Sequence, residues 1–186
     1  MQNNVRKSPS GDVPEIDPTS YVNPSAVIIG KVKIGKNCYV GPNVVVRNDE
    51  VDEDTGKVTA VVIGDNVNLQ DGVVIHALAG TGVTVGNNTS LAHCCVVHGP
   101  CKIGPGSFVG FNAVVFKTEI GSGCMVKHGA VVEGVDIPPG KVVPTGACIT
   151  SPRDLGLLQD TNTEQREFME EVVHFNVGFS QGYKKV

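Results

Sequence analysis

Aliphatic side chains recur at every sixth position along most of this chain. The first run is Val22, Ile28, Ile34, Val40 and Val46, and the same spacing resumes at Ile63 and continues, with short interruptions, to Ile149. A glycine often follows the aliphatic residue, as in IGKNC, IGDNV and IGSGC, and a small residue stands four places after it. The pattern (L/I/V)-G-x-x-small-x is repeated about twenty times, which indicates a solenoid of short strands and turns.

Each hexad is long enough for one short strand and one turn, and three hexads close a triangular coil. Coils stacked at the strand spacing of about 4.8 Å would bury the aliphatic side chains in a narrow prism. The hexads therefore predict an all-β domain over residues 20–150, a parallel β-helix of about seven triangular coils. Residues 1–19 are expected to form an N-terminal extension.

The hexad pattern ends near residue 150, and residues 151–186 are expected to form a linker followed by a C-terminal α-helix. Thr161 and Glu164 have the spacing of a capping box at the start of that helix. Beyond them, one apolar helical face contains Phe168, Val172, Phe175 and Phe179. We expect this face to pack along the prism and to cover one of its sides.

Composition agrees with a thin β-helix. Charged residues make up 18% of the chain, below the usual share of about 25%, and there are 23 glycines but no tryptophan. The net charge is −4 without a basic block, so we expect no nucleic-acid partner and no anionic membrane surface. No apolar stretch approaches the roughly 18 residues of a membrane span, and the polar N-terminus lacks a secretion signal. A cytoplasmic protein is therefore expected.

The six cysteines include no C-x-x-C pair, which disfavours a zinc site built from thiolates. The repeat places Cys38, Cys95 and Cys124 at inward-facing positions for small residues. We therefore expect these cysteines to serve as small hydrophobic side chains in a reducing compartment.

The hexads define three columns of aliphatic residues around the prism. Column A contains Ile63, Val85 and Ile103, column B contains Leu69, Leu91 and Val109, and column C contains Ile75, Val97 and Val115. His76 and His98 each follow a column C residue, so they should face outward on neighbouring coils, about 5 Å apart along the stack. Arg47 takes the same position one coil below. The spacing would let the two imidazoles reach one metal ion.

His93 follows column B, around a corner from His76 and His98, so one chain would struggle to aim all three at one ion. A threefold assembly would resolve this by taking His93 from a neighbouring subunit. Three nitrogen ligands leave a coordination position open for water, as in catalytic zinc sites. The alternative is that the stacked histidines are ordinary surface residues. His128 should lie on the order of 10 Å above His93, too far to be a ligand, and is interpreted as structural or interfacial.

Several segments resemble those of a known family, the γ-class carbonic anhydrases. The matching segments are VVVRNDE, NLQDGVVIHAL, SLAHCCVVHGPCKIG, GFNAVVF and VVPTGACITS, and the resemblance extends over roughly residues 20–183. It implies that the β-helix is left-handed and that the protein is a homotrimer with a metal at each interface. It also implies reversible hydration of CO₂ to bicarbonate by a metal-bound hydroxide. Three imidazoles suit zinc, Co²⁺ or Fe²⁺, and the sequence leaves that choice open.

The resemblance assigns roles to individual residues. It implies metal ligation by His76 and His98 of one subunit and His93 of the next. It further implies that Gln70 orients the metal-bound water or hydroxide, that Arg47 holds the bicarbonate region, and that Arg47 and Asp71 form the subunit contact. Asn68 matches a residue of the active-site wall, and Asn176 matches a residue near the site. The columns independently place Asp71 one coil below His93, although a polar interface without chemistry would look the same.

Two features depart from the family pattern. The loop after His76, which carries a glutamate proton shuttle in well-studied members, is short and uncharged here. An acidic insertion instead lies between Val46 and Ile63, and it contains Asp49, Glu50, Asp52, Glu53 and Asp54. We predict that Glu50, which matches a family carboxylate, relays protons, whereas Asp52 to Asp54 have a solvated acidic turn as their alternative. His174, where relatives often have tyrosine, is a second candidate for proton transfer.

Three other functions share this fold. A hexapeptide acyltransferase typically needs one catalytic histidine and an acyl-donor groove, so three histidines at metal spacing disfavour it. A non-catalytic bicarbonate-binding or scaffold protein is favoured by the missing shuttle loop and disfavoured by the retained ligands. A thioesterase-like hydrolase using the same metal stays open.

Overall fold

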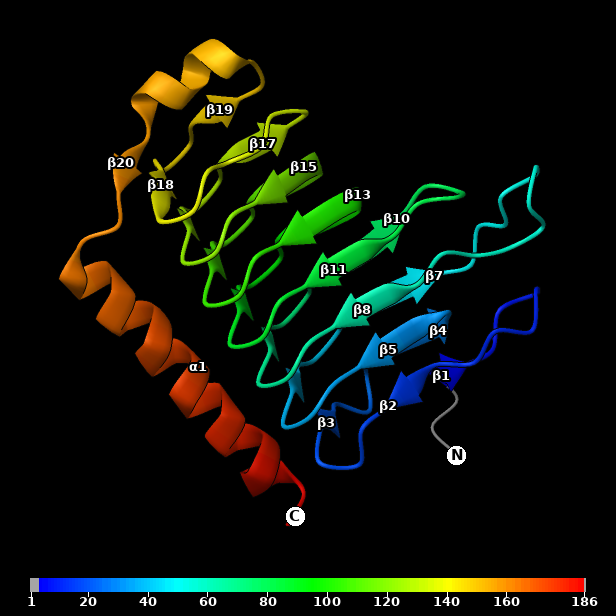
Figure 1. Ribbon diagram of the computed structural model, residues 1–186. Helices are drawn as coiled ribbons and strands as arrows, with labels where there is room; N and C mark the ends of the chain where they lie inside the picture. The colour runs from blue at the N-terminus through cyan, green and yellow to red at the C-terminus, as the bar shows by residue number, and fades with distance from the viewer. Residues whose placement is uncertain (1–3, 186) are drawn as a thin grey trace.

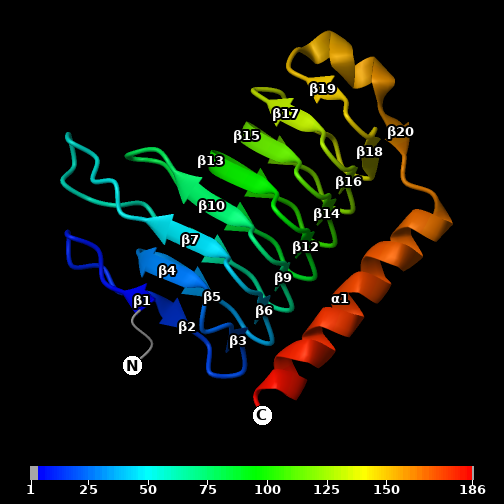
Figure 2. The ribbon, with the colours of Figure 1, turned by 180° about the vertical axis from the view of Figure 1, so that it is seen from behind.

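The computed structural model describes residues 4–185, which form a parallel β-solenoid of about 8 turns with one long helix beside it (Figure 1). The fold class predicted from the hexads is therefore confirmed. The strands lie in three columns that match columns A, B and C of the sequence. Figure 2 shows the same stack from behind, with the C-terminal helix running along the side formed by column B.

The strands of each column stack in parallel from the N-terminal to the C-terminal end of the solenoid. Column C contains β1 (Val5–Arg6), β4 (Val27–Gly30), β7 (Val45–Asn48), β10 (Val74–Ala77), the starts of β13 (Val96–Ile103) and β15 (Val114–Ile120), β17 (Val131–Glu133) and β19 (Cys148–Ile149). Column A contains β2 (Glu15–Ile16), β5 (Val32–Ile34), β8 (Val61–Ile63), β11 (Val83–Val85) and the ends of β13 and β15. Column B contains β3 (Tyr21–Val22), β6 (Tyr39–Val40), β9 (Asn68–Leu69), β12 (Ser90–Leu91), β14 (Phe108–Val109), β16 (Met125–Val126) and β18 (Lys141–Val143), with β20 (Gln159–Asp160) antiparallel to β18.

The aliphatic ladders form the core of the prism. In column C, Ile75 pairs with Val46 below it and with Val97 above it, and all three side chains are fully buried. Each such burial contributes roughly 1.5–3 kcal/mol relative to exposure, so the repeated ladder is the main source of stability. Cys38 and Cys95 are also fully buried, which confirms that the inward positions use cysteine as a small hydrophobic residue.

The corner between columns A and B is built by residues with positive φ. Asn66 and Asn88 occupy this corner on successive coils, with φ of 56° and 54°. Asparagine tolerates the left-handed conformation, and here its side chain also bonds along the stack. Asn66 Nδ2 donates to Asn88 Oδ1 at 3.0 Å, so the turn residues themselves link neighbouring coils.

The solenoid begins earlier in the chain than the hexads indicated. Val5 and Arg6 pair with Ile28 and Ile29, and Glu15 and Ile16 pair with the second column A strand, so part of residues 1–19 forms a first coil. This additional coil explains why the solenoid has about 8 turns where about seven were expected. A loop of irregular length between β1 and β2 breaks the six-residue spacing and conceals the coil from the hexad pattern.

A 3-10 helix (Pro152–Leu157) covers the C-terminal end of the prism, and β20 leads from it to α1 (Thr163–Tyr183). The capping box of α1 lies one residue later than the sequence indicated. Asn162 accepts a hydrogen bond from the Gln165 backbone N–H at 2.8 Å, and Gln165 Oε1 accepts one from the Asn162 backbone at 3.0 Å. These bonds satisfy two N–H groups that the first turn of a helix leaves free.

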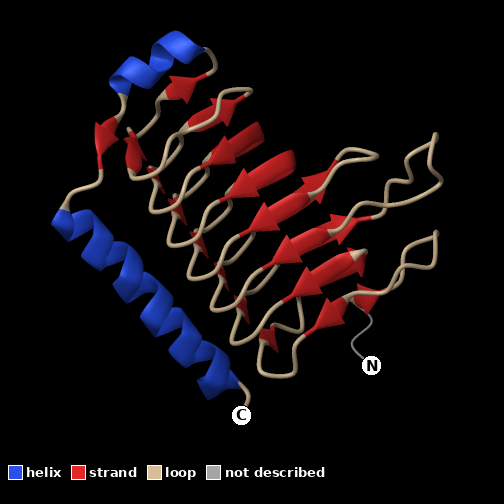
Figure 3. Ribbon diagram, viewed as in Figure 1, coloured by secondary structure: helices blue, strands red, loops and turns tan. Residues whose placement is uncertain are grey.

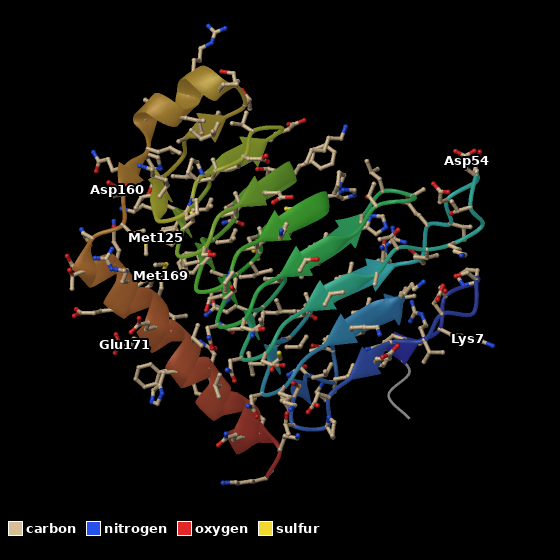
Figure 4. All side chains as sticks on the ribbon, viewed as in Figure 1. Lys7, Asp54, Met125, Asp160, Met169 and Glu171 are labelled. Carbon is tan, nitrogen blue, oxygen red and sulfur yellow. The ribbon has the colours of Figure 1, made fainter. Side chains whose placement is uncertain are left out.

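The face of α1 that packs on the prism is also shifted by one residue from the expected one. Met169 and Val173 are buried on column B, and Met169 lies beside Met125 of β16 (Figure 4). Phe168, Phe175 and Phe179 of the expected face are instead 44%, 58% and 51% exposed. The predicted face therefore lies at the edge of the contact, with Val172 packed on column B and the Phe168 ring 5.4 Å from Phe108, and α1 runs along the prism as expected.

The longest loops leave the prism at the corner between columns C and A, and Figure 3 shows them projecting from one edge. One connects β7 to β8 and carries the acidic residues, with Asp54 near its tip (Figure 4). The other connects β10 to β11, directly after His76. Both loops therefore leave the prism at the same corner. Among the helices of residues 4–185, none combines the length and apolar character that crossing a membrane requires.

Candidate metal centre

His76 of β10 and His98 of β13 lie opposite each other in the parallel ladder of column C. His76 Nδ1 is 3.1 Å from His98 Nε2, and the ring centroids are 5.0 Å apart with the planes at 74°. The aliphatic neighbours Ile75 and Val97 point into the core, so the alternation of a strand turns both histidines outward. The prediction that His76 and His98 face outward on neighbouring coils is therefore confirmed.

His76 is largely buried, and its Nε2 atom has no hydrogen-bond partner. The nearest carboxylate oxygens are Glu50 Oε1 at 3.5 Å and Asp49 Oδ1 at 3.7 Å, both from the acidic loop. Burial lowers the pKa of His76, with Arg47 and His98 acting in the same direction, while Glu50 and Asp49 oppose them. A lowered pKa favours the neutral imidazole, which is the form that binds a metal.

His98 is oriented by its own backbone. Its Nδ1 atom lies 3.1 Å from the carbonyl oxygen of Gly99. Because a carbonyl oxygen only accepts, Nδ1 carries the proton, and the lone pair of Nε2 faces His76 Nδ1. Metal-binding histidines commonly have this arrangement, in which the second ring nitrogen is held by a carbonyl or carboxylate.

His93 lies at the corner after β12, away from the His76–His98 pair. Its side chain is half exposed, and Nδ1 is 3.6 Å from Asp71 Oδ2 on the coil below. Within residues 4–185, no group of three or more histidine, cysteine, aspartate or glutamate side chains converges on a metal position. Of the three predicted ligands, one chain therefore holds two imidazoles together on one face and the third at a different corner.

Asn68 lies in the strand below the one that precedes His93, and Gln70 lies at the corner that follows it. Asn68 of β9 pairs with Ser90 in the column B ladder, and Asn68 Nδ2 donates to Ser90 Oγ at 3.4 Å. Gln70 follows β9, and its Oε1 atom is buried without a hydrogen-bond partner, as is Oδ1 of Asn68. A buried amide oxygen left unpaired is costly, so these two acceptors point to a ligand or a neighbouring subunit.

Arg47 and Glu50 connect the acidic loop to this site. Arg47 Nη1 donates to both carboxylate oxygens of Asp49, at 2.9 and 3.1 Å. Glu50 Oε2 accepts a hydrogen bond from the backbone N–H of Ala79, in the loop after His76, at 3.0 Å. The structure thus places the Glu50 carboxylate between the two loops and beside His76.

The two helical candidates lie elsewhere in the single chain. Asn176 is buried on the face of α1 that packs on column B, and its Nδ2 atom donates to the Val172 carbonyl at 2.8 Å. His174 lines a groove of about 680 Å³ between α1 and the corner of columns A and B. The chain itself brings neither residue to the His76–His98 pair.

His128 contributes to a stack of rings rather than to the histidine pair. Its Nδ1 atom accepts a hydrogen bond from the Phe111 backbone N–H at 3.0 Å, and the two rings stack with centroids 4.2 Å apart. The same Phe111 ring lies 5.4 Å from His93. Phe111 therefore separates His128 from His93, which agrees with a structural role for His128.

Asn48 is a residue of the site that the sequence analysis did not single out. It is buried, and its Nδ2 atom donates to the carbonyl oxygens of Thr59 and Thr81. These carbonyls belong to the two loops that leave the C-to-A corner. Asn48 therefore joins both loops to the strand that carries Arg47. The only sequence signal was an amide directly before the acidic insertion.

Comparisons with known proteins agree with this architecture. The bacterial transferase hexapeptide (six repeats) family matches residues 14–48 and 82–117. Carbonic anhydrase of Methanosarcina thermophila is 35% identical and covers 96% of this chain and 78% of its own length. The carboxysome assembly protein CcmM of a Nostoc species is 37% identical over 91% of this chain, which spans 31% of that longer protein. A hexapeptide transferase family protein from Anaplasma phagocytophilum superposes with a TM-score of 0.81 at 23% identity, covering 98% and 99% of the two chains, which shows the shared fold alone.

Proposed function

The chain belongs to the γ-class carbonic anhydrase family of hexapeptide-repeat proteins, and from this premise we propose that it catalyses the reversible hydration of CO₂ to bicarbonate. The proposed site is a metal centre at each interface of a homotrimer. The observation that carries the proposal is the His76–His98 pair, in which two ring nitrogens lie 3.1 Å apart and a second, buried nitrogen of His76 has no partner.

The residues present fit a divalent metal. His76 and His98 supply adjacent imidazole nitrogens, and His93 of a neighbouring subunit would complete the set. Zinc, Co²⁺ and Fe²⁺ all accept such ligands. When bound, the ion would lower the pKa of a coordinated water and so make a nucleophile available near neutral pH.

Gln70 and Arg47 would act on the reactants. The unpaired Gln70 Oε1 is an acceptor that would orient the attacking water. Arg47 uses Nη1 to hold Asp49, which leaves its other N–H groups for the bicarbonate oxygens. Asp71 would join Arg47 in the subunit contact, Asn68 would form part of the wall, and Asn176 would approach the site from the helix.

Glu50 would carry the proton away. Its carboxylate is 42% exposed at the side chain and lies 3.5 Å from His76 Nε2, so one end faces the site and the other reaches solvent. The hydrogen bond from the Ala79 backbone to Oε2 leaves Oε1 as the atom that would receive the proton. This arrangement would replace the acidic shuttle loop that the chain lacks after His76.

Stopped-flow CO₂ hydration on protein of known metal content tests the proposal. The protein would be prepared anaerobically and reloaded with zinc or Co²⁺. We expect about one metal per subunit and measurable hydration, with both lost in His98→Ala. His128→Ala is the matched control, because His128 lies at the same corner of the prism as His93 but is separated from it by the Phe111 ring. Absence of metal in the wild-type protein would contradict the proposal.

A second candidate function is a non-catalytic scaffold or bicarbonate-binding protein. Its support is the similarity to the carboxysome assembly protein CcmM, which matches this chain at slightly higher identity than the carbonic anhydrase does. Stoichiometric metal together with no hydration, in buffers with and without imidazole, would favour this function over catalysis.

A further inference from the structure

The ring of Phe116 lies directly above His98 in the next coil. Phe116 of β15 is the ladder partner of His98 in β13, and the two ring centroids are 5.3 Å apart with the planes at 83°. His76 approaches the same imidazole from the coil below, at 74°. The His98 ring is thus held edge-to-face between two rings, a geometry that aromatic pairs favour.

Lys117, the next residue, adopts a backbone conformation that lysine rarely takes. Its φ is 50°, in the left-handed region, whereas most other non-glycine residues with positive φ in the described chain are asparagines. The register shifts here, so that Gly99 and Pro100 of β13 lie opposite Lys117 alone. This conformation places Nζ 5.1 Å from the centroid of the Phe116 ring, within the range of a cation–π interaction.

A non-glycine residue in the left-handed region costs of order 1 kcal/mol, and surrounding contacts must hold it there. Strain of this kind often accompanies a functional constraint. Here the strained residue follows the one aromatic side chain that contacts His98 from above. The Lys117 ammonium group and the His98 imidazole both contact the Phe116 ring, and together they limit the orientations that this ring can take.

We propose that Phe116, held in place by Lys117, is a positioning residue that fixes the imidazole plane of His98 for metal binding. The inference rests on the proposed metal centre. Three contacts then define the His98 ring: the Gly99 carbonyl at Nδ1, His76 at Nε2, and Phe116 from above. Removing the ring above would let the imidazole tilt away from His76 without removing a ligand.

Binding of Co²⁺ to the full-length protein tests this inference, because the visible absorption of bound Co²⁺ reports ligand geometry independently of CO₂ hydration. In Phe116→Leu we expect Co²⁺ affinity to fall by about tenfold, the low end of the usual effect of residues that orient metal ligands, together with a changed absorption band. Phe116→Tyr keeps the ring and should restore both. Phe168→Leu, a phenylalanine of α1 that is 44% exposed and contacts Phe108, is the control and should leave both unchanged.

Lys117→Gly provides a second variant that accepts the positive φ without strain. We expect it to fold at least as stably as the wild-type protein and to weaken Co²⁺ binding by a smaller factor than Phe116→Leu. Wild-type affinity and absorption in both Phe116→Leu and Lys117→Gly would overturn the inference while leaving the metal centre intact. A wild-type protein that fails to bind Co²⁺ would overturn the metal centre and this inference together.

Discussion

Glu50 accepts a hydrogen bond from the Ala79 backbone at 3.0 Å, so the acidic loop and the loop after His76 are joined beside the histidine pair. The carboxylate that holds the two loops together is therefore also the one nearest to His76 Nε2, at 3.5 Å. A group in this position can have a structural role, a proton-transfer role, or both, and the two roles respond differently to substitution.

We predict that Glu50→Gln lowers turnover by on the order of a hundredfold, the usual scale for losing a general acid or base. The amide oxygen still accepts from Ala79, so the loops should stay joined, but the side chain no longer exchanges a proton. Stopped-flow CO₂ hydration in increasing imidazole should recover the rate. Glu53→Gln, an exposed position on the same loop, should behave as the wild-type protein does. Unchanged turnover in Glu50→Gln would rule out the relay.

The proposed metal centre, shared between subunits, leads to a prediction about mixed assemblies. His93→Ala and His98→Ala should each abolish the site, because each removes a ligand contributed by a different subunit. If the two variants are mixed and randomly reassembled as trimers, three quarters of the trimers contain both variants, and each of these has one intact site out of three. Metal content and hydration should therefore recover to about a quarter of the wild-type level. No recovery in trimers shown to contain both variants would exclude a site shared in this way.

The histidine pair was predictable because the repeat determines the register. Six-residue spacing assigns Ile75 and Val97 to the same column, and strand alternation then directs His76 and His98 to the same outer face. No such rule identified the buried face of α1. Hydrophobicity alone selects Phe168, Phe175 and Phe179, but the face in contact with column B includes Asn176 and Ser180. Which face of α1 is buried depends on the fit to column B, a property of the partner surface that helical periodicity does not encode.

The burial of Asn48, the last residue of β7, is the other feature that could not be predicted from the sequence. Asn48 is 1% exposed, yet it lies in a stretch of polar residues that resembles any solvated loop. Its role depends on Thr59 and Thr81, which lie 11 and 33 residues away along the chain. The Asn48 amide can join the two loops only because both of them fold back to the same corner of the prism.

Asn48 should accordingly be important for stability. In Asn48→Ala the carbonyl oxygens of Thr59 and Thr81 lose their donor, and we expect the free energy of unfolding to fall by about 1–3 kcal/mol, measured by urea denaturation. Asn48→Asp keeps the shape but turns an acceptor toward both carbonyls, so it should destabilise at least as much at pH 7. Trypsin should also cleave faster after Lys57, which lies in the loop that Asn48 holds. An Asn48→Asp protein as stable as the wild type would contradict this account.

The buried thiols predict that stability falls in alkaline solution. Burial raises the pKa of Cys38 from its ordinary value of 9.0 to about 11, and the Cys38 thiol donates to the Gly64 carbonyl at 3.1 Å. Below about pH 9 both folded and unfolded states hold this proton, so its contribution to stability is complete. Above that pH the unfolded state releases the proton while the folded state retains it, so the free energy of unfolding decreases until the folded thiol titrates near pH 11.

Cys38→Ser isolates this effect, because serine keeps a hydroxyl donor toward Gly64 but does not titrate in this range. We expect urea denaturation between pH 8.5 and pH 11 to show a shallower loss of stability in Cys38→Ser than in the wild-type protein. Cys148→Ser, at an exposed cysteine, is the matched control and should follow the wild-type curve. Identical slopes for wild type and Cys38→Ser would show that this thiol titrates alike in both states, and that its burial in the prism does not restrain its ionisation.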